Sequence, residues 1–362
     1  MGCHQNNEEY LRHFREKAAG QRIPLSGSLE LTHRCNLNCV HCYLGPQSIH
    51  KKKTDKEMGT DQILSVIDEI TEAGCLFLLI TGGEPLLRKD FSEIYSYAKR
   101  NGLLVTVFTN GTVIKENIIG LFKDLPPHEV EISLYGATAG TYERITRGIG
   151  SFGKCISGIE RLLEDGIRVR LKTMLMTLNT HEFFEIKKMA EQYGAKFRFD
   201  PAISPCLNGD RSPLEFRVAP EDAVGKEFSD RTMIHRWEDY LGKYAGQPES
   251  ETLYNCGAGI NSFHIDPYGN LFPCLMMRGI KYDLTGGNFI TGWDEVIPRI
   301  REIKANPDFI CNVCGKRDFC GFCPPSFELE NGSADAFSEY HCEMSEIRYK
   351  IMQSVNLSAG GS

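Results

Sequence analysis

The chain lacks the features that mark several large classes of protein. No stretch approaches the ~18 consecutive apolar residues that a helix needs to cross a bilayer. The first twenty residues are polar and contain no apolar core of a secretory signal peptide. Lysine and arginine total 41 against 48 acidic residues, giving a net charge of −7 and no basic footprint for nucleic acid or anionic lipid. We therefore expect a cytoplasmic protein that binds neither nucleic acid nor membrane.

Cysteine, in contrast, is abundant in this chain of 362 residues. Ten of its 14 cysteines fall into two groups, between positions 35 and 42 and between positions 256 and 342. Because the cytosol keeps thiols reduced, a disulfide framework is not expected, and the clustering indicates metal or iron–sulfur ligation. The scattered remainder suits small buried hydrophobic positions for the most part. These four are Cys3, Cys75, Cys155 and Cys206.

The first group consists of Cys35, Cys39 and Cys42, with the spacing C-x3-C-x2-C directly after a short apolar stretch. Three thiolates on one loop can hold three irons of a cubane cluster, which leaves the fourth iron open to a substrate or cofactor. A disulfide loop and a zinc knuckle are the alternatives. Structural zinc takes four ligands, and the nearest further candidate, His41, lies between two of the cysteines, where the geometry is poor.

A second motif runs from Gly82 to Pro85, where the apolar run 76–80 ends. Glycines at a strand end let the backbone approach a ligand closely, and Glu84 supplies one fixed carboxylate. Alone, Gly82-Gly83-Glu84-Pro85 is a weak turn motif. Its place at the end of a parallel strand, one strand–helix unit after three clustered cysteines, makes it a much stronger signal.

Short apolar runs alternate with helical periods between positions 27 and 200. The expected strands are 28–32, 76–81, 103–108, 130–134, 169–174 and 196–200, and the helices between them are 61–73, 91–100, 114–122, 152–165 and 181–193. Six such units imply an α/β fold with a parallel sheet and right-handed crossovers. Their similar lengths favour a partial (βα)6 TIM-like barrel over a flat sheet. Functional loops lie at the C-terminal ends of such strands, where the cysteine loop falls.

The cysteine loop and the Gly82–Pro85 motif together resemble the signature of the radical S-adenosylmethionine superfamily. In that family the methionyl amine and carboxylate chelate the open iron, and the Gly-Gly-Glu segment binds the amine. One electron from the reduced 4Fe–4S cluster cleaves the sulfonium, and the resulting 5′-deoxyadenosyl radical abstracts a hydrogen from the substrate. The resemblance implies a partial (βα)6 barrel, in agreement with the six units counted above.

The resemblance also implies further contacts with the cofactor. Asn110 follows the third strand, and Ser133 ends the fourth, where relatives use a polar residue toward the ribose or carboxylate. Here Tyr135 replaces the Asp that is usual two positions later. Arg147 lies one residue later than the position at which the family often has an Arg-Gly pair. It is equally well explained as a surface arginine. His41 aligns with a position that is usually aromatic and near the adenine.

The second group contains seven cysteines, more than one cluster or one zinc ion can use. A pair of zinc ribbons is the alternative. The pattern resembles the SPASM extension, which carries auxiliary 4Fe–4S clusters in radical S-adenosylmethionine proteins. By that resemblance the nearer cluster would be held by Cys256, Cys274 and Cys323. The distal cluster would be held by Cys311, Cys314, Cys320 and Cys342.

Two departures from the SPASM pattern leave questions open. No cysteine lies a few residues before Cys256, so the nearer cluster is short of a fourth thiolate. Two residues separate Cys320 from Cys323, where sulfatase-maturing relatives have three. Those relatives also have an Asp, which serves as the base, directly after the cysteine equivalent to Cys274. Here that position is Leu275, which argues against sulfatase maturation.

The resemblance implies an iron–sulfur oxidoreductase of the peptide maturase type, using S-adenosylmethionine and three 4Fe–4S clusters. We expect it to modify a peptide or protein oxidatively, with the auxiliary clusters taking up the electron. One alternative is a tetrapyrrole (haem-pathway) or small-molecule oxidoreductase of the same architecture. Another is a non-catalytic iron–sulfur electron carrier, which would have no need of Gly82, Gly83 and Glu84.

The expected partners are a peptide or protein substrate and a flavodoxin- or ferredoxin-type reductant. Only 34 residues precede Cys35, too few for a peptide-binding domain, so we expect any leader peptide to need a separate binding protein. The expected division of the chain is a helical extension (1–26), the barrel (27–200), a bridge (201–254), the SPASM domain (255–345) and a helix end with a disordered tail (346–362).

Overall fold

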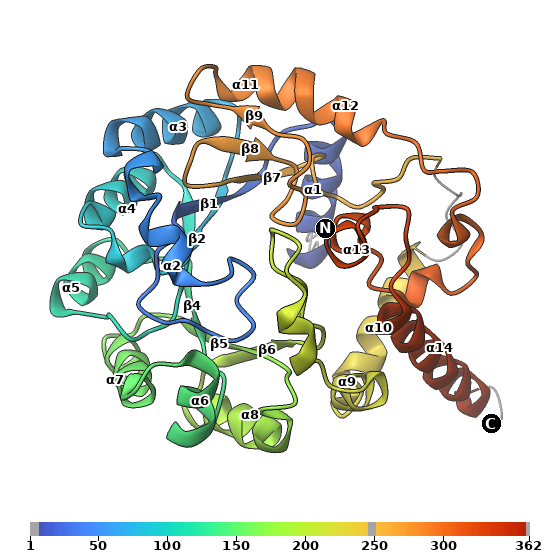
Figure 1. The fold of residues 1–362 in the computed structure, drawn as a ribbon. Coiled ribbons are helices and arrows are strands. Elements are labelled where there is room, and N and C mark those ends of the chain that lie inside the picture. The colour runs from blue at the N-terminus through green and yellow to red at the C-terminus, as the bar shows by residue number, and fades with distance from the viewer. Residues whose placement is uncertain (1–6, 245–250, 360–362) are drawn as a thin grey trace, which may run out of the picture.

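A computed structural model describes residues 7–244 and 251–359 of the chain (Figure 1). Its central feature is an arc of six parallel strands. These are β1 (Ser26–Thr32), β2 (Phe77–Gly82), β3 (Leu104–Thr109), β4 (Glu129–Ser133), β5 (Val169–Met174) and β6 (Lys196–Asp200). The strands pair in sequence order, and β6 ends the sheet without closing onto β1. The α/β partial barrel expected from the sequence is confirmed.

Helices cover the outside of this arc (Figure 1). They are α3 (Thr60–Glu72), α4 (Phe91–Arg100), α5 (Glu116–Asp124), α6 (Ala139–Thr146), α7 (Ser151–Glu164) and α8 (Phe183–Gln192). Leu29 and Leu31 of β1 are fully buried in one core with Ile63 and Ile67 of α3. Because side chains alternate along a strand, Glu30 points to the opposite side, into the barrel.

The chain after β6 adds a second layer of elements beside the barrel. It contains α9 (Pro220–Glu227), α10 (Arg231–Tyr244), β7 (Ser262–Ile265), β8 (Asn270–Phe272), β9 (Tyr282–Asp283), α11 (Phe289–Thr291), α12 (Ile297–Arg301), α13 (Pro324–Asn331) and α14 (Glu339–Ala359). Two further helices, α1 (Asn7–Gly20) and α2 (Gln47–Lys51), flank β1 in sequence. No helix in the described ranges is long and apolar enough to cross a membrane.

One feature of the sheet was not predicted from the sequence. Strand β7 pairs in parallel with β1, from Ser26 opposite Ser262 to Leu29 opposite Ile265. Strands β8 and β9 then continue the sheet in antiparallel fashion to nine strands. The hairpin is therefore built onto the free edge of β1, which the open barrel leaves unpaired.

Boundaries expected from the sequence mostly fall within two residues of the observed ones. The sequence analysis missed α6, which is only eight residues long. The last helix begins at Glu339 and reaches Ala359, so it extends through most of the segment expected as a helix end and tail (346–362). The end of the expected tail, 360–362, lies outside the described residues.

The junction of β1 and β7 has no room for an additional methyl group at Gly27. A Cβ atom there would lie 2.1 Å from Cζ of Phe263, whose ring packs against Phe289 and Trp293. We expect Gly27→Ala to lower the free energy of unfolding by about 1–3 kcal/mol, because the ring must leave its place. Chemical denaturation measures the change. Gly120→Ala is the control, since a Cβ at that position in α5 meets nothing within 4 Å; equal effects in both variants would contradict the prediction.

Candidate functional site

The loop between β1 and α2 carries Cys35, Cys39 and Cys42 at the C-terminal end of the strands, inside the arc of the barrel (Figure 1). Gln47, at the start of α2, holds the loop in shape. Its Oε1 accepts a hydrogen bond from the Cys35 backbone N–H at 2.6 Å, and its Nε2 donates to the His33 carbonyl at 3.3 Å. The Val40 N–H donates to the carbonyl at the end of α6 (residue 145), so the loop is fixed from two sides.

The two glycines after β2 lie directly against the backbone of the cysteine loop. Gly83 N donates to Thr32 O at 2.7 Å, and Glu84 N donates to Arg34 O at 2.8 Å. A Cβ on Gly82 would lie 2.2 Å from Thr32 O, and one on Gly83 would lie 2.3 Å from Arg34 O. Gly82 also has φ of +125°, which favours glycine. The glycines thus permit the two loops to touch.

Glu84 is fully buried, and its carboxylate accepts three hydrogen bonds. The donors are the Leu86 N–H at 3.1 Å, the Thr109 hydroxyl at 2.8 Å and the Asn110 N–H at 2.8 Å. Burial raises the pKa of Glu84 to about 7, although the three donors act in the opposite direction. Pro85, also buried, begins the turn that follows. The carboxylate therefore ties the end of β2 to the end of β3 and does not point into open space.

Asn110 connects that carboxylate to the cysteines. Its side-chain N–H group lies 3.6 Å from the Cys35 sulfur and donates to Asn36 Oδ1 at 2.9 Å. The Leu37 backbone N–H also points at the Cys35 sulfur, at 3.4 Å. N–H donors of this kind favour a thiolate, the form that binds iron.

The three loop thiols lie close enough to influence one another's pKa. Burial raises the pKa of Cys35 to about 12, with a further contribution from Glu84. Burial likewise raises the pKa of Cys39, and the neighbouring Cys42 and Cys35 add to the effect. Three crowded, buried thiols are deprotonated only when a cationic group neutralises them, which suits an iron–sulfur cluster.

His41 projects from the same loop and is 8% exposed. Its ring packs edge-on against Tyr135, with 4.5 Å between centroids. Burial lowers the pKa of His41 to about 4, so the ring is neutral, and among the described residues its Nδ1 has no hydrogen-bond partner. A neutral ring with one free nitrogen fits contact with a heterocycle.

Ser133 and Arg147 also lie near the cysteine loop. Ser133 ends β4 half-buried, two residues before Tyr135, whose ring packs against His41. Arg147 is exposed and follows α6 with φ of 54°. Burial is the main cause that raises the pKa of Cys39. The positive charge of Arg147 acts to lower that pKa, so Arg147 lies close enough to influence the Cys39 thiol.

The C-terminal cysteines gather in two places. Cys274 follows β8, and burial raises its pKa, with Cys256 adding to the effect. Burial also raises the pKa of Cys323 to about 11, and both Cys274 and Cys256 contribute. These are the three cysteines that the SPASM resemblance assigns to the nearer cluster.

The other four cysteines surround a hollow of about 180 Å³. It is lined by Cys311, Cys314, Cys320 and Cys342, together with Lys316, Arg317, Phe322, Ser345 and Glu346. Burial is the main cause that raises the pKa of Cys320 to about 12, and the neighbouring Cys342 and Cys311 add to the increase. The structure thus brings together the set that the SPASM resemblance assigns to the distal cluster.

The cysteine sets are not arranged as single-ion sites. Among the residues that the structure describes, no three His, Cys, Asp or Glu side chains form a group suited to hold one metal ion.

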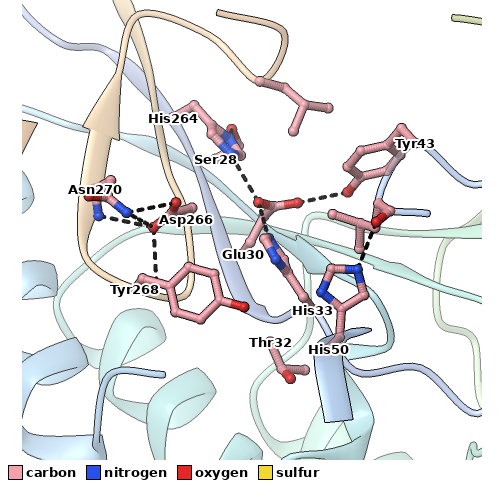
Figure 2. Close-up of polar contacts among 12 residues, drawn as sticks. Ser28, Glu30, Thr32, His33, Tyr43, His50, His264, Asp266, Tyr268 and Asn270 are labelled. Carbon is pink, nitrogen blue, oxygen red and sulfur yellow. Dashed lines mark hydrogen bonds and ion pairs between the residues drawn. The ribbon is translucent and has the colours of Figure 1, made fainter. Parts of the chain in front are cut away.

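The sequence analysis missed a buried polar network centred on Glu30 of β1 (Figure 2). Its partners are His33, Tyr43, His264 and Arg278. A charged residue between Leu29 and Leu31, in a strand otherwise suited to burial, was the available signal. The partners could not be found from the sequence, because His264 and Arg278 lie more than 230 residues away.

Several known proteins are similar to this chain in sequence or in fold. The sequence profile of the Radical SAM superfamily matches residues 29–192. Mycofactocin maturase MftC of Mycobacterium ulcerans (strain Agy99) is 28% identical over 313 residues, covering 83% of each chain. An AdoMet-dependent heme synthase of Methanosarcina barkeri is 26% identical over 321 residues, covering 81% of this chain and 89% of the relative.

A solved structure, Streptococcus suis SuiB bound to the precursor peptide SuiA, shares the fold with a TM-score of 0.66 at 17% identity. The match covers 94% of this chain and 82% of SuiB. Residues 29–192 contain both the cysteine loop and the Gly82–Pro85 motif. Residues 29–192 therefore form a domain of the Radical SAM superfamily, whose members use S-adenosylmethionine and a 4Fe–4S cluster.

Proposed function

We propose that this enzyme cleaves S-adenosylmethionine reductively to a 5′-deoxyadenosyl radical and uses it to modify a peptide or protein oxidatively. The observation that carries the proposal is the joined pair of loops after β1 and β2. There, Cys35, Cys39 and Cys42 converge, and Glu84 fixes Asn110 against the Cys35 sulfur. An electron carrier that never binds S-adenosylmethionine would not need this second loop.

In this proposal the three loop cysteines hold the 4Fe–4S cluster, which supplies the electron that cleaves the cofactor. Gly82, Gly83, Glu84 and Pro85 shape the cofactor site beside it, since they fix the backbone that faces the cysteine loop. His41 and Ser133 contact the adenosine, because His41 lies in the cysteine loop and Ser133 ends β4, two residues before the Tyr135 ring that packs on His41. Arg147 contributes positive charge at the edge of the site, as its effect on Cys39 indicates.

Two auxiliary 4Fe–4S clusters complete the proposed cofactor set. The nearer is held by Cys256, Cys274 and Cys323, and its fourth ligand is not a cysteine of the second group. The distal cluster fills the hollow lined by Cys311, Cys314, Cys320 and Cys342. After hydrogen abstraction from the substrate, one electron must leave the substrate radical, and these clusters accept it.

The substrate class follows from the relatives. MftC is named a maturase, and SuiB is solved with a precursor peptide; both support a peptide substrate here. The match to a heme synthase favours a tetrapyrrole as the second candidate. We further propose a cytoplasmic enzyme with a flavodoxin- or ferredoxin-type reductant and a separate leader-binding protein, because the cluster must be reduced and a peptide presented for each turnover.

Iron content and cofactor cleavage together test the proposed function. Anaerobic reconstitution is expected to give about 12 irons per chain, and dithionite with S-adenosylmethionine should then yield 5′-deoxyadenosine. Cys35→Ala should keep about 8 irons and lose cleavage, because only the barrel cluster is removed. Chemical iron assay and liquid chromatography measure both.

The matched control is Cys75→Ala, which removes a buried cysteine outside all three cysteine sets. It should retain both iron and cleavage. About 4 irons per chain in the parent enzyme, with zinc at the second cysteine group, would overturn the auxiliary clusters. Cleavage that persists in Cys35→Ala would overturn the assignment of the cofactor site.

Removing the charge of Glu84 should damage both stability and cofactor cleavage. In Glu84→Gln the new amide N–H group faces a backbone N–H donor, so one hydrogen bond is replaced by repulsion. We expect a loss of about 1–3 kcal/mol in the free energy of unfolding and at least a tenfold slower cleavage, because Asn110 moves away from Cys35. Denaturation and 5′-deoxyadenosine formation are the two measurements.

Glu182→Gln is the control for Glu84→Gln. Glu182 also accepts several hydrogen bonds, from Ala137 N and the Thr138 and Thr141 hydroxyls, but outside the cysteine loop. It should lose a similar amount of stability and keep its rate of cleavage. Equal loss of cleavage in both variants would show that Glu84 acts only through overall stability.

A further inference from the structure

The Glu30 network joins β1 and the loop after it to the hairpin of β7 and β8 (Figure 2). The Glu30 carboxylate is fully buried. One oxygen accepts the Tyr43 hydroxyl at 2.7 Å, and the other lies 2.9 Å from Nε2 of His33 and 3.2 Å from Nε2 of His264. The Arg278 guanidinium is 3.5 Å from the same oxygen.

These partners come from two separate segments. Tyr43 directly follows Cys42, and His33 precedes Cys35 by two residues. His264 lies on β7, and Arg278 lies four residues after Cys274. One carboxylate therefore contacts both the cysteine loop of the barrel and the hairpin that leads to the nearer auxiliary cysteines.

The hairpin side of the network is itself held tightly. The second nitrogen of His264, Nδ1, lies 2.7 Å from the Ser28 hydroxyl on β1. Arg278 donates from Nε to the Leu275 carbonyl at 2.8 Å and lies over the Phe272 ring at 4.7 Å. These contacts fix Arg278 to the turn around Cys274. The distance between Arg278 and Glu30 therefore depends on where that turn lies.

Burial acts to raise the pKa of Glu30, but His33 and His264 hold it well below its usual range, so the carboxylate is ionised. A buried charge is tolerated only while its partners stay in place. If the hairpin moved away from the barrel, Glu30 would lose Arg278 and His264 together. Because such a separation would cost free energy, the network holds the two segments together.

We propose that Glu30 is a positioning residue that clamps the auxiliary-cluster hairpin against the cysteine loop and so fixes the spacing between their two clusters. The part of this inference that concerns the clusters rests on the proposed function. The contacts of Glu30 involve only residues of this chain and do not depend on it. A fixed spacing matters because the substrate radical, made beside the first cluster, must pass its electron to the second before it reacts elsewhere.

Hydrogen exchange of the reconstituted enzyme, followed by mass spectrometry, tests the clamp without any substrate. Glu30→Gln should speed exchange about tenfold in the peptides covering 33–47 and 262–278 together. Arg278→Gln changes only the hairpin, yet it should also speed exchange in 33–47. Exchange that rises only on the mutated side, or in neither segment, would overturn the proposal.

Glu131→Gln is the matched control, because Glu131 is another buried carboxylate facing an arginine, Arg198, at 2.6 Å. It touches neither segment and should leave their exchange unchanged. In the double variant Glu30→Gln with Arg278→Gln, both charges of the Glu30–Arg278 pair are removed together, so the two effects should be less than additive. Full additivity would contradict a shared clamp.

A spectroscopic readout separates positioning from loss of stability. The magnetic interaction between the reduced barrel cluster and the nearer auxiliary cluster depends on their separation and broadens their electron paramagnetic resonance signals. Glu30→Gln should alter this broadening while Glu131→Gln leaves it unchanged, and an unaltered signal in Glu30→Gln overturns the clamp. If the auxiliary cluster itself is absent, the proposed function fails, whereas the exchange experiment still decides whether the clamp exists.

Discussion

The contact on which the site depends is the close backbone approach between the loops after β1 and β2. Gly83 and Glu84 donate N–H groups to the carbonyls of Thr32 and Arg34, and no side chain fits between them. Because the Glu84 carboxylate then holds the end of β3, three neighbouring strand ends are joined in one unit. Hydrogen bonds of 2.7–2.8 Å connect these three strand ends.

Much of this unit could be predicted from the sequence, because its signals are local. Three cysteines within eight residues and the segment Gly82–Pro85 each occupy one turn after a strand. The alternation of apolar runs and helical periods then places both turns on one edge of the sheet. What the sequence could not show is the direction of Glu84. Its side chain points inward to Asn110 and Thr109, so its part is to position other groups.

The residues that escaped prediction belong to long-range contacts. Glu30 stands out only as a charge in an apolar strand, and its partners His264 and Arg278 come from the far end of the chain. The pairing of β7 with β1 was missed for the same reason. A parallel pair gives no turn signal, and strand partners separated by more than 200 residues cannot be inferred from periodicity alone.

The pairing of β7 with β1 explains how the two cysteine groups can act together. The barrel is open, so β1 keeps a free edge, and β7 occupies it in parallel register. Ser28 and Glu30 therefore face the same interior as His264, and β8 leads from there straight to Cys274. An auxiliary site attached by a flexible linker would sample many separations from the barrel loop. An auxiliary site built on the same sheet has one separation, and a buried carboxylate that needs partners on both sides makes any other separation costly.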